Sequence, residues 1–287
     1  KKIEGTAQPI SNIKVSHGTI ERGPDSATLQ FNNADIEESP MAQMLEDRFL
    51  RQCLMQKIKE NNLIDLIEQR KIVEINDLNK QKQLTLDNNS KLKTSLIVAS
   101  DGINSPTAKA FGIKKAGWKY KQRGLVCAVN HEYSSNNTAY QYFLPEGPLA
   151  ILPIKNNTAS IVWTESIQNA ATISEMSEAE YLSVLQNRFG DFLGKLKLTG
   201  KRLSFPLKLS ISEKYVSDKF AVIGDAAHGY HPIAGQGLNA GLRDIAALVD
   251  VISCARERGE DFSSINILNR YQEWRRFDNQ ALGFATD

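Results

Sequence analysis

AVIGDAAHGYHPIAGQGLNAGL, residues 221–242, is the stretch that decides the fold class of this sequence. It opens on a short apolar run that is typical of a buried strand, and the run ends at Gly224-Asp225. A long helical pattern begins farther along, at Gly237. Asp225 is therefore expected at the carboxyl end of a strand, which is where open α/β sheets bind their ligands.

The residues that follow this strand have the chemistry of a cofactor cradle. Asp225 can accept hydrogen bonds from sugar-like hydroxyl groups. Gly235 and Gly237 allow a ligand to come close to the backbone. The next helix would turn its free N–H groups and the positive end of its dipole toward that ligand. The alternative interpretation is an ordinary glycine-rich turn between a strand and a helix.

A second predicted strand and turn support the expectation of a cofactor site. Residues 95–100, SLIVAS, are a short apolar run suited to a buried parallel strand, and they lead into Asp101-Gly102. A strand that ends in a common Asp-Gly turn is the alternative here.

The order of these motifs resembles that of the FAD-dependent aromatic hydroxylases, the group A flavoprotein monooxygenases. The form GDAAH, HP and AGQGLN is most similar to the branch that acts in ubiquinone biosynthesis. In that family the Asp of the second motif contacts the ribityl chain, and the loop after the proline lies against the isoalloxazine ring. The resemblance implies a set of FAD-binding residues: Arg48, Asp101, Gly102, Asp225, Pro232, Gly235, Gln236, Gly237, Leu238 and Asn239. For Arg48, a solvated helix face is the alternative.

Two features depart from the family pattern. The family has an arginine at the third position after the serine of its Asp-Gly motif, where this sequence has Ala108 with Lys109 beside it. A lysine lacks the bidentate fork of arginine, which weakens the expectation of nicotinamide binding and of loop anchoring. The sequence also has no G-x-G-x-x-G turn, which in the family holds the ADP half of FAD, and it opens at Lys1. We therefore expect the FAD-binding domain to be N-terminally truncated and this chain by itself to be inactive.

Two histidines lie in the loop beside the expected flavin. His231, with His228, is a candidate proton relay for a phenolic substrate, but packing or capping within the loop is the favoured interpretation. His17 and His131 have no partner pattern, and no metal site is expected. Three cysteines far apart in the sequence fit a reducing cytosol.

The fold class is predicted to be α/β (α+β) with two domains. Runs at 124–133, 139–144, 149–154 and 159–166 predict an antiparallel sheet. We expect a Rossmann-like FAD-binding domain with a parallel sheet, formed by residues 1–113 and 216–287, and a substrate domain inserted at 114–215.

Capping signals predict the helices. Ser39-Pro40 would begin a helix that reaches about Glu60, and Ser177 with Glu180 forms a capping box. Long helices are expected over 237–258 and 264–283, and a strand over 63–67.

The resemblance implies an aromatic-ring hydroxylase that uses FAD, NAD(P)H and dioxygen through a flavin hydroperoxide. Its substrate would be a polyprenylated phenol or quinol on the route to ubiquinone. The enzyme would be cytoplasmic and would meet this greasy substrate at the inner membrane surface or within a ubiquinone-biosynthesis complex. Two alternatives stay open: a hydroxylase of a soluble aromatic compound, and a non-catalytic flavin-fold remnant that acts in binding or assembly.

Composition excludes other classes. A net charge of +2 and the lack of a polybasic tail argue against a nucleic-acid partner. The apolar runs are too short for a transmembrane segment.

Overall fold

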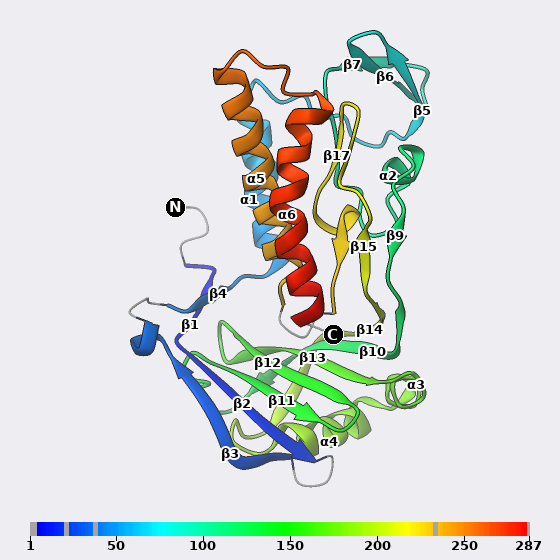
Figure 1. Ribbon diagram of the computed structural model, residues 1–287. Coiled ribbons are helices and arrows are strands. Elements are labelled where there is room, and N and C mark those ends of the chain that lie inside the picture. Colours follow the sequence, from blue (N-terminus) through cyan, green and yellow to red (C-terminus); the bar gives the residue numbers. More distant parts are fainter. Residues whose placement is uncertain (1–4, 20–22, 37–39, 232–234, 286–287) are drawn as a thin grey trace. The chain divides into compact units, whose positions relative to one another are not determined.

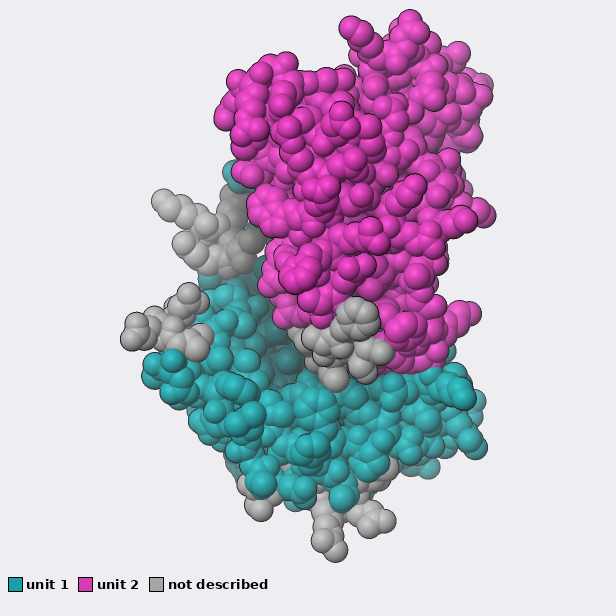
Figure 2. All heavy atoms as spheres, in the orientation of Figure 1, with its two compact units in different colours: residues 1–66, 121–206 teal, residues 67–120, 207–287 magenta. Residues whose placement is uncertain are grey.

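The chain folds into two compact units that both combine helices with β-sheet. The computed structural model describes residues 5–19, 23–36, 40–231 and 235–285. Unit 1 consists of residues 1–66 and 121–206, and unit 2 consists of residues 67–120 and 207–287 (Figure 2). The predicted mixed α/β class is confirmed.

Unit 1 is built on a seven-stranded sheet with the order β14-β10-β13-β12-β11-β2-β3 (Figure 1). Strands β10 to β13 pair as antiparallel neighbours, as the alternating pattern predicted. The strands are β2 (Asn12–Thr19), β3 (Gly23–Asn32), β10 (Lys119–His131), β11 (Thr138–Leu144), β12 (Gly147–Ile154), β13 (Thr158–Ser166) and β14 (Leu196–Lys208).

Two helices, α3 (Ile167–Glu175) and α4 (Glu178–Phe189), pack on one face of this sheet (Figure 1). The predicted capping box is present, because the Ser177 hydroxyl accepts from the Glu180 amide while the Glu180 carboxylate accepts from the Ser177 amide. Trp163 of β13 and Tyr181 of α4 are buried in the core between sheet and helices. Alternate residues of each strand therefore point away from this core.

The division of the chain differs from the predicted one. Residues 12–32 were expected in the FAD-binding domain, 1–113 with 216–287, but β2 and β3 extend the sheet of unit 1. β2 pairs in parallel with β11, from Asn12 opposite Thr138 to His17 opposite Phe143. A pairing between segments so distant in the sequence leaves no local pattern, which is why the prediction missed it.

The helix expected from Ser39-Pro40 begins later. The helix α1 spans Asp47–Lys59, and the strand β4 (Ala42–Met44) precedes it. β4 pairs with β1 (Gln8–Ile10), so strand pairing overrides the local capping signal. Ser39 lies outside the described residues, and residues 63–67 form no strand in the described part of the chain. A short 3-10 helix spans Asn33–Ile36.

Unit 2 contains three small sheets. A meander consists of β5 (Ile72–Leu78), β6 (Gln81–Leu86) and β7 (Lys91–Thr94). A second sheet has β8 (Ile97–Ala99) and β16 (Val216–Ser217) on either side of β17 (Phe220–Val222), and a third has β9 (Lys115–Ala116) and β18 (His228–Gly229) on either side of β15 (Ser210–Ser212). The helices are α2 (Pro106–Ala110), α5 (Gly237–Glu257) and α6 (Ile265–Ala285).

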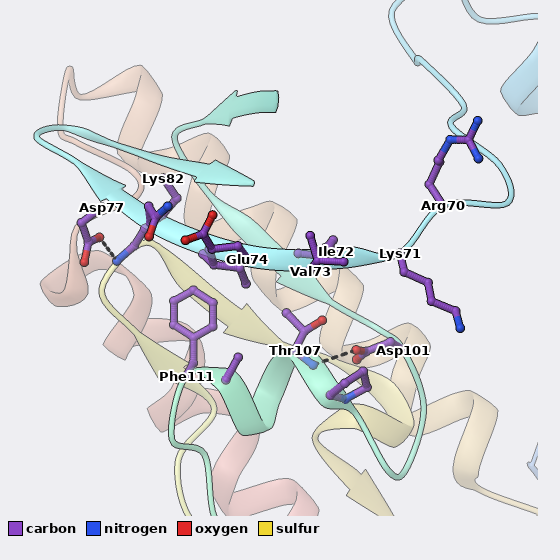
Figure 3. Close-up of a pocket in the computed structure, with 14 residues that line it drawn as sticks. Arg70, Lys71, Ile72, Val73, Glu74, Asp77, Lys82, Asp101, Thr107 and Phe111 are labelled. Carbon is purple, nitrogen blue, oxygen red and sulfur yellow. Dashed lines mark hydrogen bonds and ion pairs between the residues drawn. The ribbon is translucent and has the colours of Figure 1, made fainter. Parts of the chain in front are cut away.

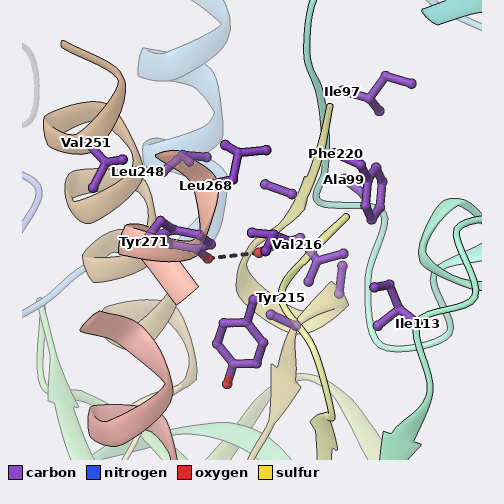
Figure 4. Close-up of a cluster of buried hydrophobic side chains, with 14 of the residues drawn as sticks. Ile97, Ala99, Ile113, Tyr215, Val216, Phe220, Leu248, Val251, Leu268 and Tyr271 are labelled. Atoms are coloured by element: carbon purple, nitrogen blue, oxygen red, sulfur yellow. Dashed lines mark hydrogen bonds between the residues drawn. The ribbon is translucent and has the colours of Figure 1, made fainter. Parts of the chain in front are cut away.

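The predicted parallel strand pair lies at the centre of unit 2. β17 pairs in parallel with β8, and Phe220, Ala221 and Val222 are buried. The long helices α5 and α6, also predicted, pack against this sheet through residues such as Leu248 and Tyr271 (Figure 4). The Tyr271 hydroxyl donates to the carbonyl of Val222 at 2.8 Å. Among the described helices, none is both long and apolar enough to cross a bilayer.

Candidate flavin site

The two motif loops leave the same edge of the central sheet of unit 2. β8 and β17 run parallel with Ala99 opposite Val222, and the amide of Ile223 donates to the carbonyl of Ala99 at 3.0 Å. Both strands end there, so the loop that carries Asp101 and the loop that carries Asp225 begin side by side. This is the carboxyl edge of a parallel pair, where α/β sheets bind ligands.

One half-buried lysine, Lys115, connects these two loops. The ammonium group of Lys115 donates to the carbonyl oxygen of Ile103 at 2.8 Å and to that of Asp225 at 3.2 Å. Burial lowers the pKa of Lys115, and the neighbouring Lys208 lowers it further, while Asp225 and Asp101 act in the opposite direction. Lys115 was not among the residues predicted for the site, because no local pattern distinguishes it from a surface lysine.

Asp101 organises its own loop. Its carboxylate accepts hydrogen bonds from the Ser105 hydroxyl and, at 3.1 Å, from the backbone amide of Thr107. Burial alone would raise the pKa of the Asp101 carboxyl, but these bonds bring the pKa below its ordinary value. The Ser105 hydroxyl in turn caps α2 by accepting from the amide of Ala108. Gly102 has a φ of +86°, which favours glycine at this turn.

Ala108 stands where the family has an arginine, and the neighbouring Lys109 does not replace that arginine. Ala108 is buried in the core of unit 2, whereas Lys109 is exposed. Adjacent residues of a helix point in different directions, so Lys109 does not occupy the position of the Ala108 side chain. The loop is anchored instead through Lys115, which reaches the carbonyl of Ile103 from β9.

Asp225 is presented to solvent by a tight turn. The 3-10 helix Gly224–Ala226 follows β17, and Gly224 has a φ of +57°. Asp225 is exposed, next to the half-buried Gly224 and the buried Ala226. In the described part of the chain, Lys115 donates to the backbone carbonyl of Asp225 and not to its carboxylate. Its carboxylate oxygens are free to accept hydrogen bonds from hydroxyl groups of a ligand.

The N-terminus of α5 is open. Gly235 has a φ of +59°, and a Cβ at Gly235 or Gly237 would meet no atom within 4 Å. Gln236 at the N-cap makes no side-chain capping hydrogen bond, and Leu238 and Asn239 of the first turn are exposed. The first N–H groups of a helix have no intrahelical partner, so this end offers donors and a positive dipole end. Pro232 lies outside the described residues.

The 224–229 loop makes two close backbone contacts, one with the Asp-Gly loop and one with α5. A Cβ at Gly229 would lie 2.4 Å from Cδ1 of Ile103, and a Cβ at Gly241 would lie 3.3 Å from Cα of Gly224. The 224–229 loop is thereby packed against the Asp-Gly loop on one side and against α5 on the other. Unit 2 thus brings Asp101, Gly102, Asp225 and the residues 235–239 to one end of its central sheet.

This donor set fits part of a flavin. A free carboxylate suits the hydroxyls of a ribityl chain, and bare N–H groups at a helix terminus suit the electron-rich oxygens of the ring or a phosphate. The open space at Gly235 and Gly237 leaves room for a flat ring against the backbone.

The two loop histidines are buried. His228 pairs with Asp244 of α5, with 2.6 Å between Nε2 and Oδ2, and the side chain has no solvent exposure. His231 is 6% exposed and meets the ring of Tyr120 edge-on, with ring centroids 5.1 Å apart. These surroundings support the packing interpretation over the proton relay.

Arg48 belongs to unit 1. It lies on α1 with its side chain 70% exposed, and its Nε is 2.9 Å from a carboxylate oxygen of Glu46. Its guanidinium also lies over the ring of Phe49. A flavin contact by Arg48 stays a prediction.

A separate hollow of about 720 Å³ opens between the meander and α2 (Figure 3). Lys82 and Asp77 are paired at one end of it, and Asp101 and Thr107 are bonded at the other. Of the predicted cofactor residues, Asp101 alone is among the residues that line it. In the described ranges, no three His, Cys, Asp or Glu side chains are grouped as metal ligands.

The family model described as "FAD binding domain" matches residues 26–282. The chain belongs to this FAD-binding family. The resemblance read from the two motifs is therefore confirmed, and FAD is the cofactor that the family binds.

Members of the FAD-binding family with curated names are similar over most of this chain. It is 34% identical to ubiquinone hydroxylase UbiL of Rhodospirillum rubrum over 286 residues, which cover 99% of the chain and 65% of that relative. It is 31% identical to the 3-demethoxyubiquinol 3-hydroxylase of Escherichia coli over 263 residues, which cover 92% of the chain and 67% of that relative. The chain thus spans about two thirds of the length of these relatives.

A solved structure shares the fold of this chain. PqsL of Pseudomonas aeruginosa superposes with a TM-score of 0.82 over 99% of this chain and 79% of its own, at 21% sequence identity. This likeness supports the FAD-binding fold.

Proposed function

We propose that this chain is part of an FAD-dependent monooxygenase that hydroxylates the aromatic ring of a polyprenylated phenol or quinol in ubiquinone biosynthesis. One observation carries the proposal: a free carboxylate at Asp225 and the open N-terminus of α5 lie at the end of the sheet that also carries the Asp-Gly loop. The names of the Rhodospirillum and Escherichia relatives supply the substrate class.

Each part of the site has a role in holding FAD. Asp225 would hold hydroxyls of the ribityl chain, and the backbone from Gly235 to Asn239 would hold the ring. Asp101 and Gly102 shape the neighbouring loop, and Lys115 fixes its distance from the Asp225 loop. FAD, reduced by NAD(P)H, supplies the oxygen activation, and the protein supplies orientation and the exclusion of water.

Unit 1 offers a surface of suitable chemistry for the substrate ring. On the sheet face away from α3 and α4, Val162 lies between Val126 and Ala150, and all three are partly exposed. Ala128 and Leu152 flank Ser160 in the same way. Small apolar side chains on a flat sheet face can pack against an aromatic ring. We propose that the phenol ring binds this face.

The substrate class determines where the enzyme works. A polyprenyl chain is strongly apolar, so we propose that the enzyme, acting in the cytoplasm, collects its substrate at the inner membrane surface or from a ubiquinone-biosynthesis complex.

The test is a turnover assay with labelled dioxygen. The whole protein that contains this chain is purified and incubated with FAD, NADH or NADPH, isotopically labelled O₂, and a demethoxyubiquinol with a short prenyl chain. Mass spectrometry then measures incorporation of one labelled oxygen into the ring. An Asp225→Ala variant should lose this incorporation, and an Asp250→Asn variant, changed at an exposed position of α5, should keep it.

Labelled prenylated product supports the proposal. Label in a soluble phenol such as 4-hydroxybenzoate, with none in the prenylated quinol, would reject the ubiquinone substrate in favour of a soluble aromatic one. Absence of FAD binding and of labelled product together would favour the non-catalytic remnant.

A further inference from the structure

We propose that Asp244 is the positioning residue of the flavin site, because its buried carboxylate fixes both ends of the loop that presents Asp225. The role rests on the proposed function, since the loop matters for the reaction only if Asp225 binds flavin. Asp244 does not touch the cofactor region itself and acts through Gly224 and His228.

One carboxylate oxygen of Asp244 holds the loop at two points. Oδ2 accepts from the backbone amide of Gly224 at 2.9 Å and is 2.6 Å from Nε2 of His228. These residues lie just before and shortly after Asp225. The intervening turn is therefore fastened at its start and at its end to one atom, which restricts where the Asp225 carboxylate can point.

The other oxygen fastens the same group to α6. Oδ1 accepts from Nε of Arg275 at 2.9 Å and from Nδ2 of Asn279 at 3.3 Å. Arg275 is 3% exposed in its side chain and also contacts Asp278 at 2.6 Å. The carboxylate of Asp244 thus joins the loop to two helices, α5 and α6, and its negative charge is compensated inside the protein.

Stability alone does not explain an aspartate at this position. Asp244 is fully buried and lies on the apolar face of α5, between Ala240 and Ala247 or Leu248. Burying a charged pair costs desolvation that an apolar residue of similar size would avoid. What the carboxylate provides, and an apolar side chain does not, is a fixed set of acceptors for the Gly224 amide and for His228. The geometry therefore points to control of the loop position.

The test compares Asp244→Asn with Asp250→Asn. An asparagine has one oxygen and one NH₂ group, so either the loop donors or the α6 donors lose their acceptor, whichever way the amide turns. Asp250 lies on the same helix, is exposed, and receives the same chemical change. His228→Gln is the milder variant, because it alters one of the two loop attachments and leaves the Gly224 bond intact.

Two measurements are made on the purified whole protein and on each of its variants: hydrogen–deuterium exchange without cofactor, and the dissociation constant for FAD by quenching of flavin fluorescence. Asp244→Asn should speed exchange in peptides over residues 223–230 by at least about tenfold, which corresponds to the loss of one hydrogen bond to a charged group. Exchange in the sheet of unit 1 should be unchanged. FAD should bind about tenfold more weakly or worse, His228→Gln should show a smaller effect of the same kind, and Asp250→Asn should match the parent.

The outcomes separate this proposal from the proposed function. Unchanged loop exchange in both Asp244→Asn and His228→Gln would overturn the positioning role, whatever happens to FAD. Faster loop exchange with undiminished FAD affinity would also overturn it, since a displaced loop would then not matter for binding. If the unsubstituted whole protein binds no FAD at all, the proposed function fails, and the exchange data still decide whether Asp244 holds the loop. If Asp244→Asn does not fold, His228→Gln decides alone.

Discussion

Replacing Gly237 with valine separates ligand binding from folding more cleanly than any other change at this site. Gly237 is the first residue of α5, it has no positive φ, and a Cβ there would meet nothing within 4 Å. The protein itself therefore has room for the side chain. Valine and glycine also differ in helix propensity by only a few tenths of a kcal/mol, roughly, so the free energy of unfolding should change by less than about 0.5 kcal/mol.

The cofactor, in contrast, is expected to fill this open space. If the isoalloxazine ring lies against the backbone at 235–239, the valine methyl groups would occupy part of its volume. Overpacking costs about 1–3 kcal/mol, which corresponds to a loss of FAD affinity of roughly 5- to 150-fold. The expected result is thus a folded protein with unchanged unfolding free energy and weakened FAD binding.

Urea unfolding and fluorescence titration with FAD, both on the whole protein that contains this chain, measure the free energy of unfolding and the FAD affinity in parallel. Ala246→Val adds a branched side chain at an exposed position of the same helix and should leave both quantities at the parent value, apart from the small propensity cost of valine. Undiminished FAD affinity in Gly237→Val would refute a ring contact at this helix end. A large loss of stability would refute the inference that the space belongs to the ligand.

Three further changes probe other parts of the account. Asp225→Ala removes an exposed carboxylate, so stability should stay within about 0.5 kcal/mol while FAD affinity falls by about one to two decades; equal flavin content after dialysis would contradict the ribityl contact. Gly117→Ala should lower the free energy of unfolding of unit 2, measured with urea, by about 1–3 kcal/mol, because the new Cβ would lie 2.1 Å from the backbone oxygen of Leu209 and the φ of this residue is +148°. Asp244→Asn should change how the free energy of unfolding depends on pH in the acidic range. Burial alone would raise the pKa of Asp244, but hydrogen bonds from His228, Arg275 and Gly224 lower it below its ordinary value. The contribution of the Asp244 carboxylate to the free energy of unfolding is complete well above the unfolded-state pKa of about 3.9 and is lost as the pH falls through that value toward the lower folded-state pKa. The stability gap between parent and variant should therefore be constant near neutral pH and narrow once the pH falls below about 5; a gap that stays constant in acid would show that the carboxylate charge does not contribute.

The sequence predicted those parts of the fold that local patterns encode. The apolar runs at 95–100 and 220–223 became β8 and β17, and the pattern from Gly237 became α5. The capping box at Ser177 and the four strands between 119 and 166 were likewise visible, because propensity and alternation act over neighbouring residues.

Long-range pairings were not visible in the same way. The parallel pairing of β2 with β11 and the pairing of β4 with β1 join segments whose local patterns do not name their partners. Lys115 looks like a surface lysine in sequence, and its role depends on where two loops from distant strands meet. Asp244 did leave a signal: an acidic residue on the apolar face of a predicted helix, between Ala240 and Leu248, indicates a buried charge with a partner. Its partner Arg275 could be identified only from the structure.

The most direct test of the flavin site is hydrogen–deuterium exchange of the whole protein that contains this chain, with and without saturating FAD. The account predicts slower exchange with FAD in peptides over 101–105, 223–231 and 235–240, and no change in peptides over β12 and β13, residues 147–166. Protection of residues 70–77 beside the hollow of Figure 3, with none at 223–231 and 235–240, would contradict the central claim that FAD binds where the two motif loops meet the N-terminus of α5.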